Sequence, residues 1–229
     1  MKRYIPHIIS ALLLGLAGCK SDSEFLNVKP QSVLTNEQAF SDPALVLSII
    51  SDLYNRQLDF SSLDGDGWLT FADFAETFPS QNNQSSIVQR DSWGFDRWAT
   101  WDYAYIRDLN LFIERATAAE GLSEDNKRRF LAEARFLRAN YYFEMVKRMG
   151  GVPLILKSMV YDFGGDPGYL QFPRAKESEL YDFVISEADS IKNDLPVNIS
   201  EKSRASKGAA LAMAARAALY AGSIGKYCA

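Results

Sequence analysis

The 229-residue sequence predicts an all-α protein built from tetratricopeptide-like helical hairpins with a long irregular loop region. Apolar residues recur at spacings of three and four in successive segments, which is the pattern of helices with a buried face. The last of these segments is crowded with glycine and alanine, and small faces let paired helices approach closely. Residues 58–96 are instead rich in serine, asparagine, glutamine, glycine and aspartate, as loops are.

The first helix is expected over about residues 42–57. Pro43 suits a first helical turn, and one face after it is apolar, formed by Val46, Ile49, Ile50, Leu53 and Tyr54. A second helix is expected over 98–119, because apolar residues step along it by three and four from position 101. On that spacing Trp101 is a core residue, and Trp98 packs at the start of the same helix.

A third helix is expected from an N-cap at Ser123 to about Met149. It has apolar stripes on two sides, so we expect it to be the central helix, packed between neighbours. Arg135 and Arg138 lie between these stripes, and we expect them to pair with acidic residues of neighbouring helices. The run Gly150-Gly151-Val152-Pro153 ends the helix, because glycine allows a C-terminal turn and proline forbids its continuation.

Residues 154–173 are expected to be extended or looped, and they form the one long break in the helical half. An amphipathic helix follows over 176–195 and is closed by Pro196. The last helix is expected over about 204–222. Its small residues should form the face that packs against a neighbouring helix: Gly208, Ala212, Ala215, Ala218 and Ala221.

The N-terminus has the features of an export signal. Lys2 and Arg3 precede an apolar run over 8–14, which is shorter than the roughly 20 residues that a membrane span needs. Leu16-Ala17-Gly18-Cys19 resembles the bacterial lipobox, in which the cysteine is lipidated and becomes the first mature residue. We therefore expect residues 1–18 to be a lipoprotein signal peptide and residues 19–41 to be a lipidated N-terminus and tether.

Charge and composition exclude several classes of function. The net charge of −4 becomes more negative when residues 1–18 are removed, which argues against nucleic acid as a partner. The one histidine, His7, lies in that segment, so Cys/His zinc sites and histidine-based triads are excluded. Lipidation of Cys19 leaves Cys228 without a disulfide partner. No cofactor is expected.

Several segments together resemble one family, the SusD/RagB outer-membrane lipoproteins of glycan-foraging bacteria. The most specific are FLAEARFLRANYYFEMVKRMGGVPLIL (130–156) and RASKGAALAMAARAALYAG (204–222). The segment FLNVKPQSVLTNEQAF (25–40) and the lipobox support them. Residues 20–24 also resemble the acidic signal that sends such lipoproteins to the outer face of the outer membrane.

The resemblance implies a fold, a partner and a location. Residues 42–229 would be the N-terminal helical domain of such a protein, and we expect a C-terminal half that this chain does not contain. The partner would be a TonB-dependent outer-membrane transporter of the SusC type. The protein would be anchored by lipid to the cell outer membrane, exposed at the surface, and would capture oligosaccharide or another nutrient for import.

The loop region offers groups suited to a sugar ligand. All four tryptophans fall between positions 68 and 101, and with Trp98 and Trp101 assigned to a helix, Trp68 and Trp93 are left to stack on sugar rings. Side chains that could bind hydroxyl groups are Asp73, Gln81, Asn82, Asn83 and Gln84. The alternative is that the two tryptophans cover the core under a long loop and that the Asn/Gln run is only solvated.

The stretch SLDGDGWLTFAD (62–73) raises the question of calcium. Asp64 and Asp66 fit the third and fifth positions of an EF-hand loop, and Gly67 fits the sixth. The first position is Ser62, and the last is Asp73, which is one methylene shorter than the usual bidentate glutamate. A turn made by Asp-Gly-Asp-Gly is therefore the simpler interpretation, and no metal is expected.

Two functions fit these features, and a third is disfavoured. The leading hypothesis is a non-enzymatic nutrient-binding lipoprotein, because clustered tryptophans suit a glycan surface. The alternative is a lipid-anchored tetratricopeptide-like scaffold for protein interactions in the cell envelope, which does not need loop tryptophans. A glycoside hydrolase needs two carboxylates roughly 5–9.5 Å apart across a cleft, and the sequence singles out no such pair.

Overall fold

The computed structural model describes residues 36–57, 100–161, 163–198 and 202–227, which belong to one compact unit over Asn36–Ala229. Its helices, in chain order, are α3 (Asn36–Ala39), α4 (Pro43–Asn55), α7 (Tyr103–Ala118), α8 (Glu124–Met149), the short 3₁₀ helix η2 (Pro167–Leu170), α9 (Glu177–Ile191) and α10 (Lys207–Tyr227). No strand occurs in the described ranges. The all-α fold predicted from the sequence is confirmed.

Side-chain caps explain where the helices begin. The Asp42 carboxylate accepts a hydrogen bond from the backbone N–H of Ala44 (2.8 Å) ahead of α4. Ser123 caps α8, as predicted. Asp102 caps α7, where its carboxylate accepts from the N–H of Tyr105 at 2.9 Å. An N-cap residue is not helical itself, so α7 begins five residues later than the expected start at position 98.

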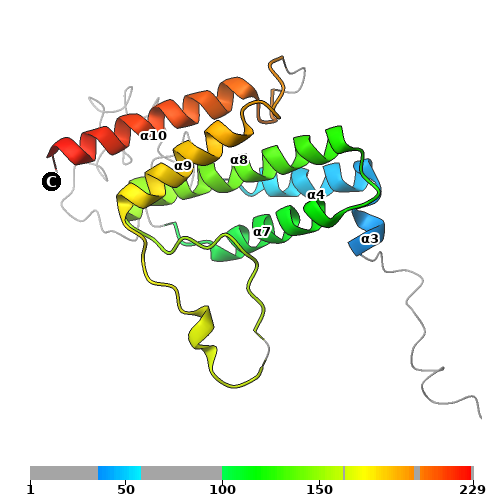
Figure 1. Ribbon diagram of the computed structural model, residues 1–229, viewed down its shortest axis with the longest axis horizontal. Coiled ribbons are helices and arrows are strands. Elements are labelled where there is room, and N and C mark those ends of the chain that lie inside the picture. The colour runs from blue at the N-terminus through cyan, green and yellow to red at the C-terminus, as the bar shows by residue number, and fades with distance from the viewer. Residues whose placement is uncertain (1–35, 58–99, 162, 199–201, 228–229) are drawn as a thin grey trace, which may run out of the picture. The chain divides into compact units, whose positions relative to one another are not determined.

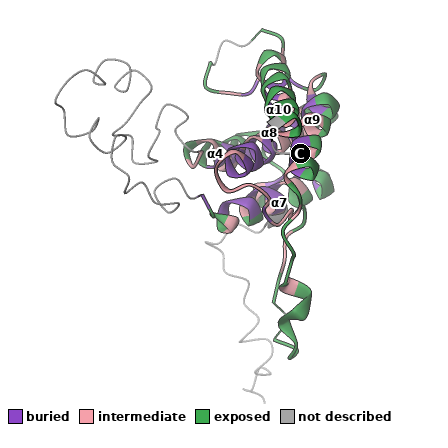
Figure 2. Ribbon diagram, turned by 90° about the vertical axis from the view of Figure 1, so that its left-hand side faces the viewer, coloured by how far each residue is buried: buried purple, intermediate pink, exposed green. Residues whose placement is uncertain are grey.

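Helix α8 is the centre of the unit. Figure 1 shows α4 and α7 on one side of it and α9 and α10 on the other. Its buried residues occur on several faces, among them Leu137, Tyr142, Phe143 and Met145, and Figure 2 shows burial concentrated where the helices meet. Burying each such side chain contributes roughly 1.5–3 kcal/mol. The prediction of a central helix with two apolar sides is confirmed.

Helix α10 packs against α9, but not through the stripe of small residues predicted from the sequence. Its buried residues are Ala210, Met213 and Ala217. Gly208, Ala212, Ala215 and Ala218 are exposed, and of the predicted stripe only Ala221 is partly buried. The prediction was wrong because alanine occurs on every face of this helix, so its spacing does not mark the buried side.

The connection between α8 and α9 leaves the helical body as a long loop (Figure 1). Gly150 has a φ of +70°, which a residue with a side chain rarely adopts. A Cβ on Gly151 would lie 2.2 Å from the carbonyl oxygen of Ala175, on the returning arm of the loop. The predicted glycine stop is therefore confirmed, and it also brings the two arms together. None of the helices in the described ranges is long and apolar enough to cross a membrane.

Candidate functional site

The site residues predicted from the sequence lie outside the residues that the structure describes. They are the lipidation site Cys19, the ligand candidates Trp68, Asp73, Asn82, Asn83 and Trp93, and the calcium candidates Asp64 and Asp66. These assignments remain predictions. Within the described ranges, no group of three or more histidine, cysteine, aspartate or glutamate side chains is placed to hold a metal ion.

Trp101 is not a core residue, which corrects the prediction made from helical spacing. Because α7 begins at Tyr103, Trp101 lies before the helix, and 43% of its surface is exposed. Its ring stacks on that of Tyr103, with centroids 6.2 Å apart and planes 27° apart. The Arg174 guanidinium lies 5.4 Å from the centroid of the Trp101 ring. We call these three residues the Trp101 platform.

Hydrogen bonds to the backbone hold the platform in place. The Tyr103 hydroxyl donates to the carbonyl of Pro153 at 2.8 Å. The Arg174 guanidinium donates to the carbonyls of Met149 (2.9 Å) and Gly151, at the end of α8. The platform is therefore fixed to the end of the central helix rather than carried by a free side chain.

The chemistry of the Trp101 platform suits a sugar. Exposed aromatic rings can pack against the C–H face of a pyranose, and their π faces attract partial positive charge. A guanidinium has five N–H donors, more than the two carbonyls that Arg174 meets, and hydroxyl groups can accept from the others. Sequence periodicity missed this site, although the aspartate at position 102 was a signal for a later helix start.

A buried network fixes the arm of the loop that leaves α8. The Tyr142 hydroxyl accepts from the N–H of Ile155 (2.8 Å) and donates to its carbonyl (3.0 Å). The Asn110 amide donates to the carbonyls of Ile155 and Lys157 at 3.0 and 3.2 Å. Arg138 donates to the Asn110 side-chain oxygen at 2.8 Å. This arm is therefore bound to α7 and α8 along its length.

Arg138 and Arg135 pair with the same carboxylate, that of Glu187 on α9. The Nη2 of Arg135 lies 2.6 Å from Oε1, and the Nη2 of Arg138 lies 3.2 Å from Oε2. Burial alone would raise the pKa of Glu187, but the two guanidinium groups hold it below its ordinary value. The prediction that both arginines pair with an acidic residue of a neighbouring helix is confirmed.

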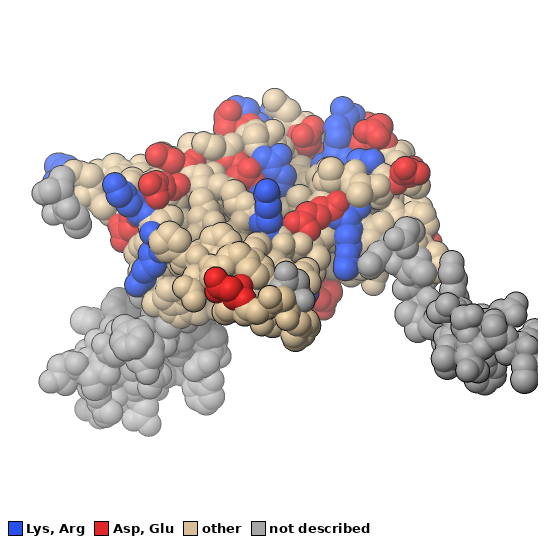
Figure 3. All heavy atoms as spheres, turned by 60° about the horizontal axis from the view of Figure 1, so that its bottom comes forward, with Lys and Arg blue, Asp and Glu red and all other residues tan. Residues whose placement is uncertain are grey.

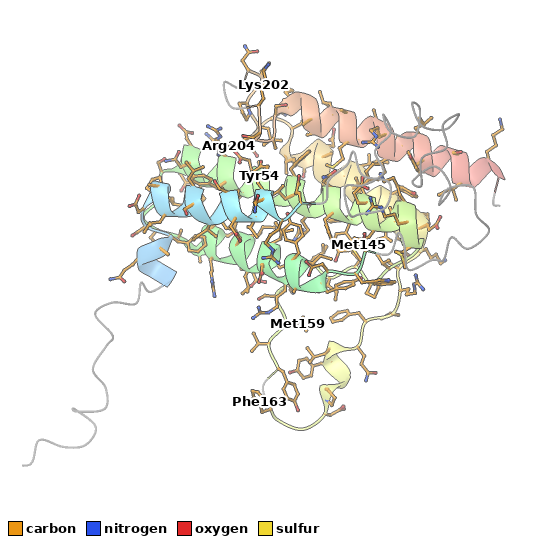
Figure 4. All side chains as sticks on the ribbon, turned by 180° about the vertical axis from the view of Figure 1, so that it is seen from behind. Tyr54, Met145, Met159, Phe163, Lys202 and Arg204 are labelled. Carbon is orange, nitrogen blue, oxygen red and sulfur yellow. The ribbon has the colours of Figure 1, made fainter. Side chains whose placement is uncertain are left out.

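A second buried carboxylate, Glu133, joins three parts of the chain. It is fully buried on α8 and meets the guanidinium groups of Arg129 (3.1 Å) and Arg204 (2.6 Å). The Tyr54 hydroxyl donates to it at 3.1 Å and accepts from the N–H of Ala205 at 2.9 Å. Figure 4 shows Tyr54 and Arg204 close together at this site. The buried Glu133 carboxylate is thus neutralised by guanidinium groups of the same chain, which suits a structural role.

The surface near α3 and α4 has two adjoining hollows. One, of about 550 Å³, is lined by Phe40, Ser41, Arg115 and residues 118–121. The other, of about 400 Å³, also includes Phe40 and Arg115 and adds charged side chains, with Arg56 paired to Asp108 at 2.7 Å. The charged groups in the second hollow thus already neutralise one another in part.

Comparison with known proteins identifies the family. A SusD-like family described as "Starch-binding associating with outer membrane" matches residues 24–219. The chain belongs to this SusD-like family. None of the curated proteins compared with the chain matches it.

Solved structures share the fold of this chain. A SusD-like protein of Bacteroides fragilis NCTC 9343 is 27% identical, with a TM-score of 0.57 over 88% of this chain and 38% of that one. A SusD-like carbohydrate-binding protein of the same strain is 21% identical, with a TM-score of 0.59 over 80% and 38%. One from Bacteroides vulgatus ATCC 8482 is 16% identical, with a TM-score of 0.55 over 81% and 43%. The chain thus spans about two fifths of the length of these relatives.

Family membership bears on two of the predictions. SusD-like proteins bind carbohydrate and are not enzymes, in agreement with the prediction of a non-enzymatic protein. The family is associated with the outer membrane, which agrees with the coarse part of the predicted location.

Proposed function

We propose that this chain is part of an outer-membrane lipoprotein that binds oligosaccharide and delivers it to a TonB-dependent transporter of the SusC type. The observation that carries the proposal is the family match, which covers most of the chain and is described by starch binding and the outer membrane. The protein from Bacteroides fragilis that is 27% identical is likewise described as SusD-like.

The Trp101 platform supports the binding half of the proposal. It provides an exposed aromatic plane and a fixed cation, which are the groups that recognise C–H faces and hydroxyls of a sugar. Trp101 also ends the sequence stretch that holds the other ligand candidates, Trp68, Asp73, Asn82, Asn83 and Trp93. A scaffold that binds only proteins does not need an exposed tryptophan and arginine arranged in this way.

The proposal that the protein is lipid-anchored rests on Cys19 and the lipobox before it. Each buried methylene of an acyl chain contributes about 0.8 kcal/mol, so the several chains of a bacterial lipoprotein hold it on the membrane. The acidic residues after Cys19 favour a surface-exposed position through their likeness to export signals of this kind.

Isothermal titration tests the binding half. The chain without residues 1–18 and with Cys19→Ser is titrated with maltoheptaose and with a panel of other oligosaccharides. We expect heat of binding for at least one glycan, and a weaker affinity when Trp68 and Trp93 are replaced together by alanine. No binding to any glycan, together with specific binding of an envelope protein, would favour the scaffold alternative.

A further inference from the structure

Arg174 is a fixed guanidinium that has no carboxylate partner among the described residues. Its Nε donates to the carbonyl of Gly151, and its Nη2 donates to the carbonyl of Met149 at 2.9 Å. These carbonyls lie at the C-terminus of α8 and just after it, where the helix dipole supplies only about half an elementary charge. The contacts that fix Arg174 therefore do not neutralise its full positive charge.

The carboxylates that are closest to the platform in sequence are used elsewhere. Asp102 caps α7, where it accepts from the backbone N–H of Tyr105. The Oε1 of Glu177 lies 2.7 Å from the position that a Cβ on Gly150 would take. Neither carboxylate forms an ion pair with Arg174, so an anion from outside the chain would be the first full counter-charge that this guanidinium meets.

The hydrogen bonds of Arg174 leave one edge of its guanidinium unused. The carbonyls take the edge formed by Nε and Nη2, which is the edge that Arg135 offers to Glu187 at 3.0 and 2.6 Å. The other edge, formed by Nη1 and the second hydrogen of Nη2, has no partner among the described residues. Two parallel N–H donors on such an edge match the two oxygens of a carboxylate. This edge is also held in place, because the first edge is bound to the backbone.

The charge on the rest of the surface limits the kind of anion. In Figure 3, acidic and basic side chains alternate over the face that is shown, without a broad patch of one sign. The net charge of the chain is −4, so a densely charged polyanion is not attracted to the protein as a whole. A mainly neutral ligand with a single carboxylate fits these charges better.

We infer that the Trp101 platform binds a uronic acid residue of a mainly neutral oligosaccharide, with the carboxylate on the free edge of Arg174 and the sugar ring against Trp101. This rests on the proposed function and names the class of glycan. A uronic acid carries its carboxylate on the carbon attached to the pyranose ring. One such residue can reach both side chains, because the guanidinium lies 5.4 Å from the centroid of the Trp101 ring, which is 43% exposed. A neutral hexose would leave Arg174 without a counter-charge.

Isothermal titration with matched ligands tests this inference. The chain used for the glycan titration above is titrated with oligosaccharides that each carry one glucuronic or galacturonic acid residue. Each is paired with the same oligosaccharide after its carboxyl group has been reduced to the neutral alcohol. We expect at least one acidic ligand to bind about tenfold more tightly than its reduced form. The difference should narrow as salt is added, because salt screens an exposed ion pair.

Variants assign this preference to Arg174. Arg174→Gln removes the charge but keeps an N–H donor for the carbonyls, and its affinities for the acidic and reduced ligands should become equal. Arg174→Lys keeps the charge without the two parallel donors, so a smaller preference should remain. The matched control is Arg115→Gln, which removes the same charge from an exposed arginine near the other end of α7 that has no ion pair with a described residue. The control should keep the wild-type preference.

Equal affinities of the wild type for the acidic and reduced ligands would overturn the inference and leave the proposed function standing. Binding of neutral glycans alone would do the same. A wild-type preference that persists in Arg174→Gln would also overturn it; if that variant has a lowered melting temperature, an undiminished preference in Arg174→Lys decides against the inference instead. No heat of binding with any glycan, acidic or neutral, would overturn the binding half of the proposed function, and this inference with it.

Discussion

The Nη2 of Arg204 lies 2.6 Å from Oε1 of Glu133, and the Nε of the same guanidinium lies 3.0 Å from Oε2. This bidentate ion pair joins the turn before α10 to the buried side of α8. Its carboxylate is fully buried and its guanidinium largely so. The position of α10 is thus tied to the central helix by a charge pair as well as by apolar packing.

Glu133→Ala should destabilise the protein strongly. The substitution leaves the Arg204 guanidinium without its carboxylate in a buried place, and breaking a buried pair in this way costs about 3–5 kcal/mol. Urea denaturation followed by circular dichroism measures the loss. Glu124→Ala is the control, since Glu124 is exposed in the first turn of α8 and should change the free energy of unfolding by about 0.5 kcal/mol or less. A similar small effect at Glu133 would contradict the structural role.

Tyr142→Phe should loosen the arm of the loop that leaves α8. The backbone N–H and carbonyl of Ile155 both bond to the hydroxyl that this substitution removes. Leaving a buried donor without its partner costs about 1–3 kcal/mol, and because Ile155 is only partly buried we expect the lower end of this range. Hydrogen exchange should show faster exchange at the amide of Ile155, with the amides of α4 as an internal control. Unchanged protection at Ile155 would show that the hydroxyl does not hold the loop.

The free energy of unfolding should fall at alkaline pH. Burial raises the pKa of each of three tyrosines, Tyr141, Tyr142 and Tyr181, to about 12, against about 10 in an unfolded chain. The folded state therefore favours the neutral phenols. Their contribution to the free energy of unfolding is fully present below about pH 10 and is lost as the pH rises to about 12. Thermal melting between pH 9 and 12 should show a falling melting temperature, with a shallower fall in Tyr142→Phe. Equal slopes for both proteins would contradict the assignment.

Helices α4, α8 and α9 could be predicted from the sequence because their signals are local. Pro43, Ser123 and Gly150 act on the backbone within a turn of themselves, and the apolar spacing between them fixes which face is buried. The start of α7 was predicted too early because aromatic spacing was given more weight than the cap at Asp102. The buried face of α10 could not be predicted, since nearly every face of it carries alanine.

For the buried networks, the sequence could predict the chemical type of the partner but not the individual residue. The positions of Arg135 and Arg138 between apolar stripes indicated that they pair with acidic residues, but only the packing of α9 selects Glu187. The bond from Ala205 to the Tyr54 hydroxyl joins residues 151 positions apart, which no local pattern encodes. Arg129 also reaches the buried Glu133, because its own helix carries that carboxylate one turn later.

Cys19→Ala should release the protein from the membrane. The Cys19 thiol is the nucleophile that accepts the diacylglycerol group, so its loss prevents the lipidation that holds the protein in the bilayer. Fractionation of cells into membrane and soluble parts, followed by detection with an antibody, measures the change. Cys228→Ala is the matched control and should remain with the membrane. Retention of the Cys19 variant in the membrane fraction would contradict the lipid anchor.

Trp101→Ala should weaken glycan binding without unfolding the protein. Stacking of an aromatic ring contributes about 0.5–1.5 kcal/mol beyond the area that it buries, so the dissociation constant should rise by about tenfold, and Trp101→Phe should fall between. Because Trp101 is 43% exposed, the melting temperature should change little. Leu219→Ala is the control, since Leu219 is 72% exposed on α10 and takes part in none of the contacts described for the platform. Equal affinities for the wild type and Trp101→Ala would remove the Trp101 platform from the binding site, while the family assignment would stand.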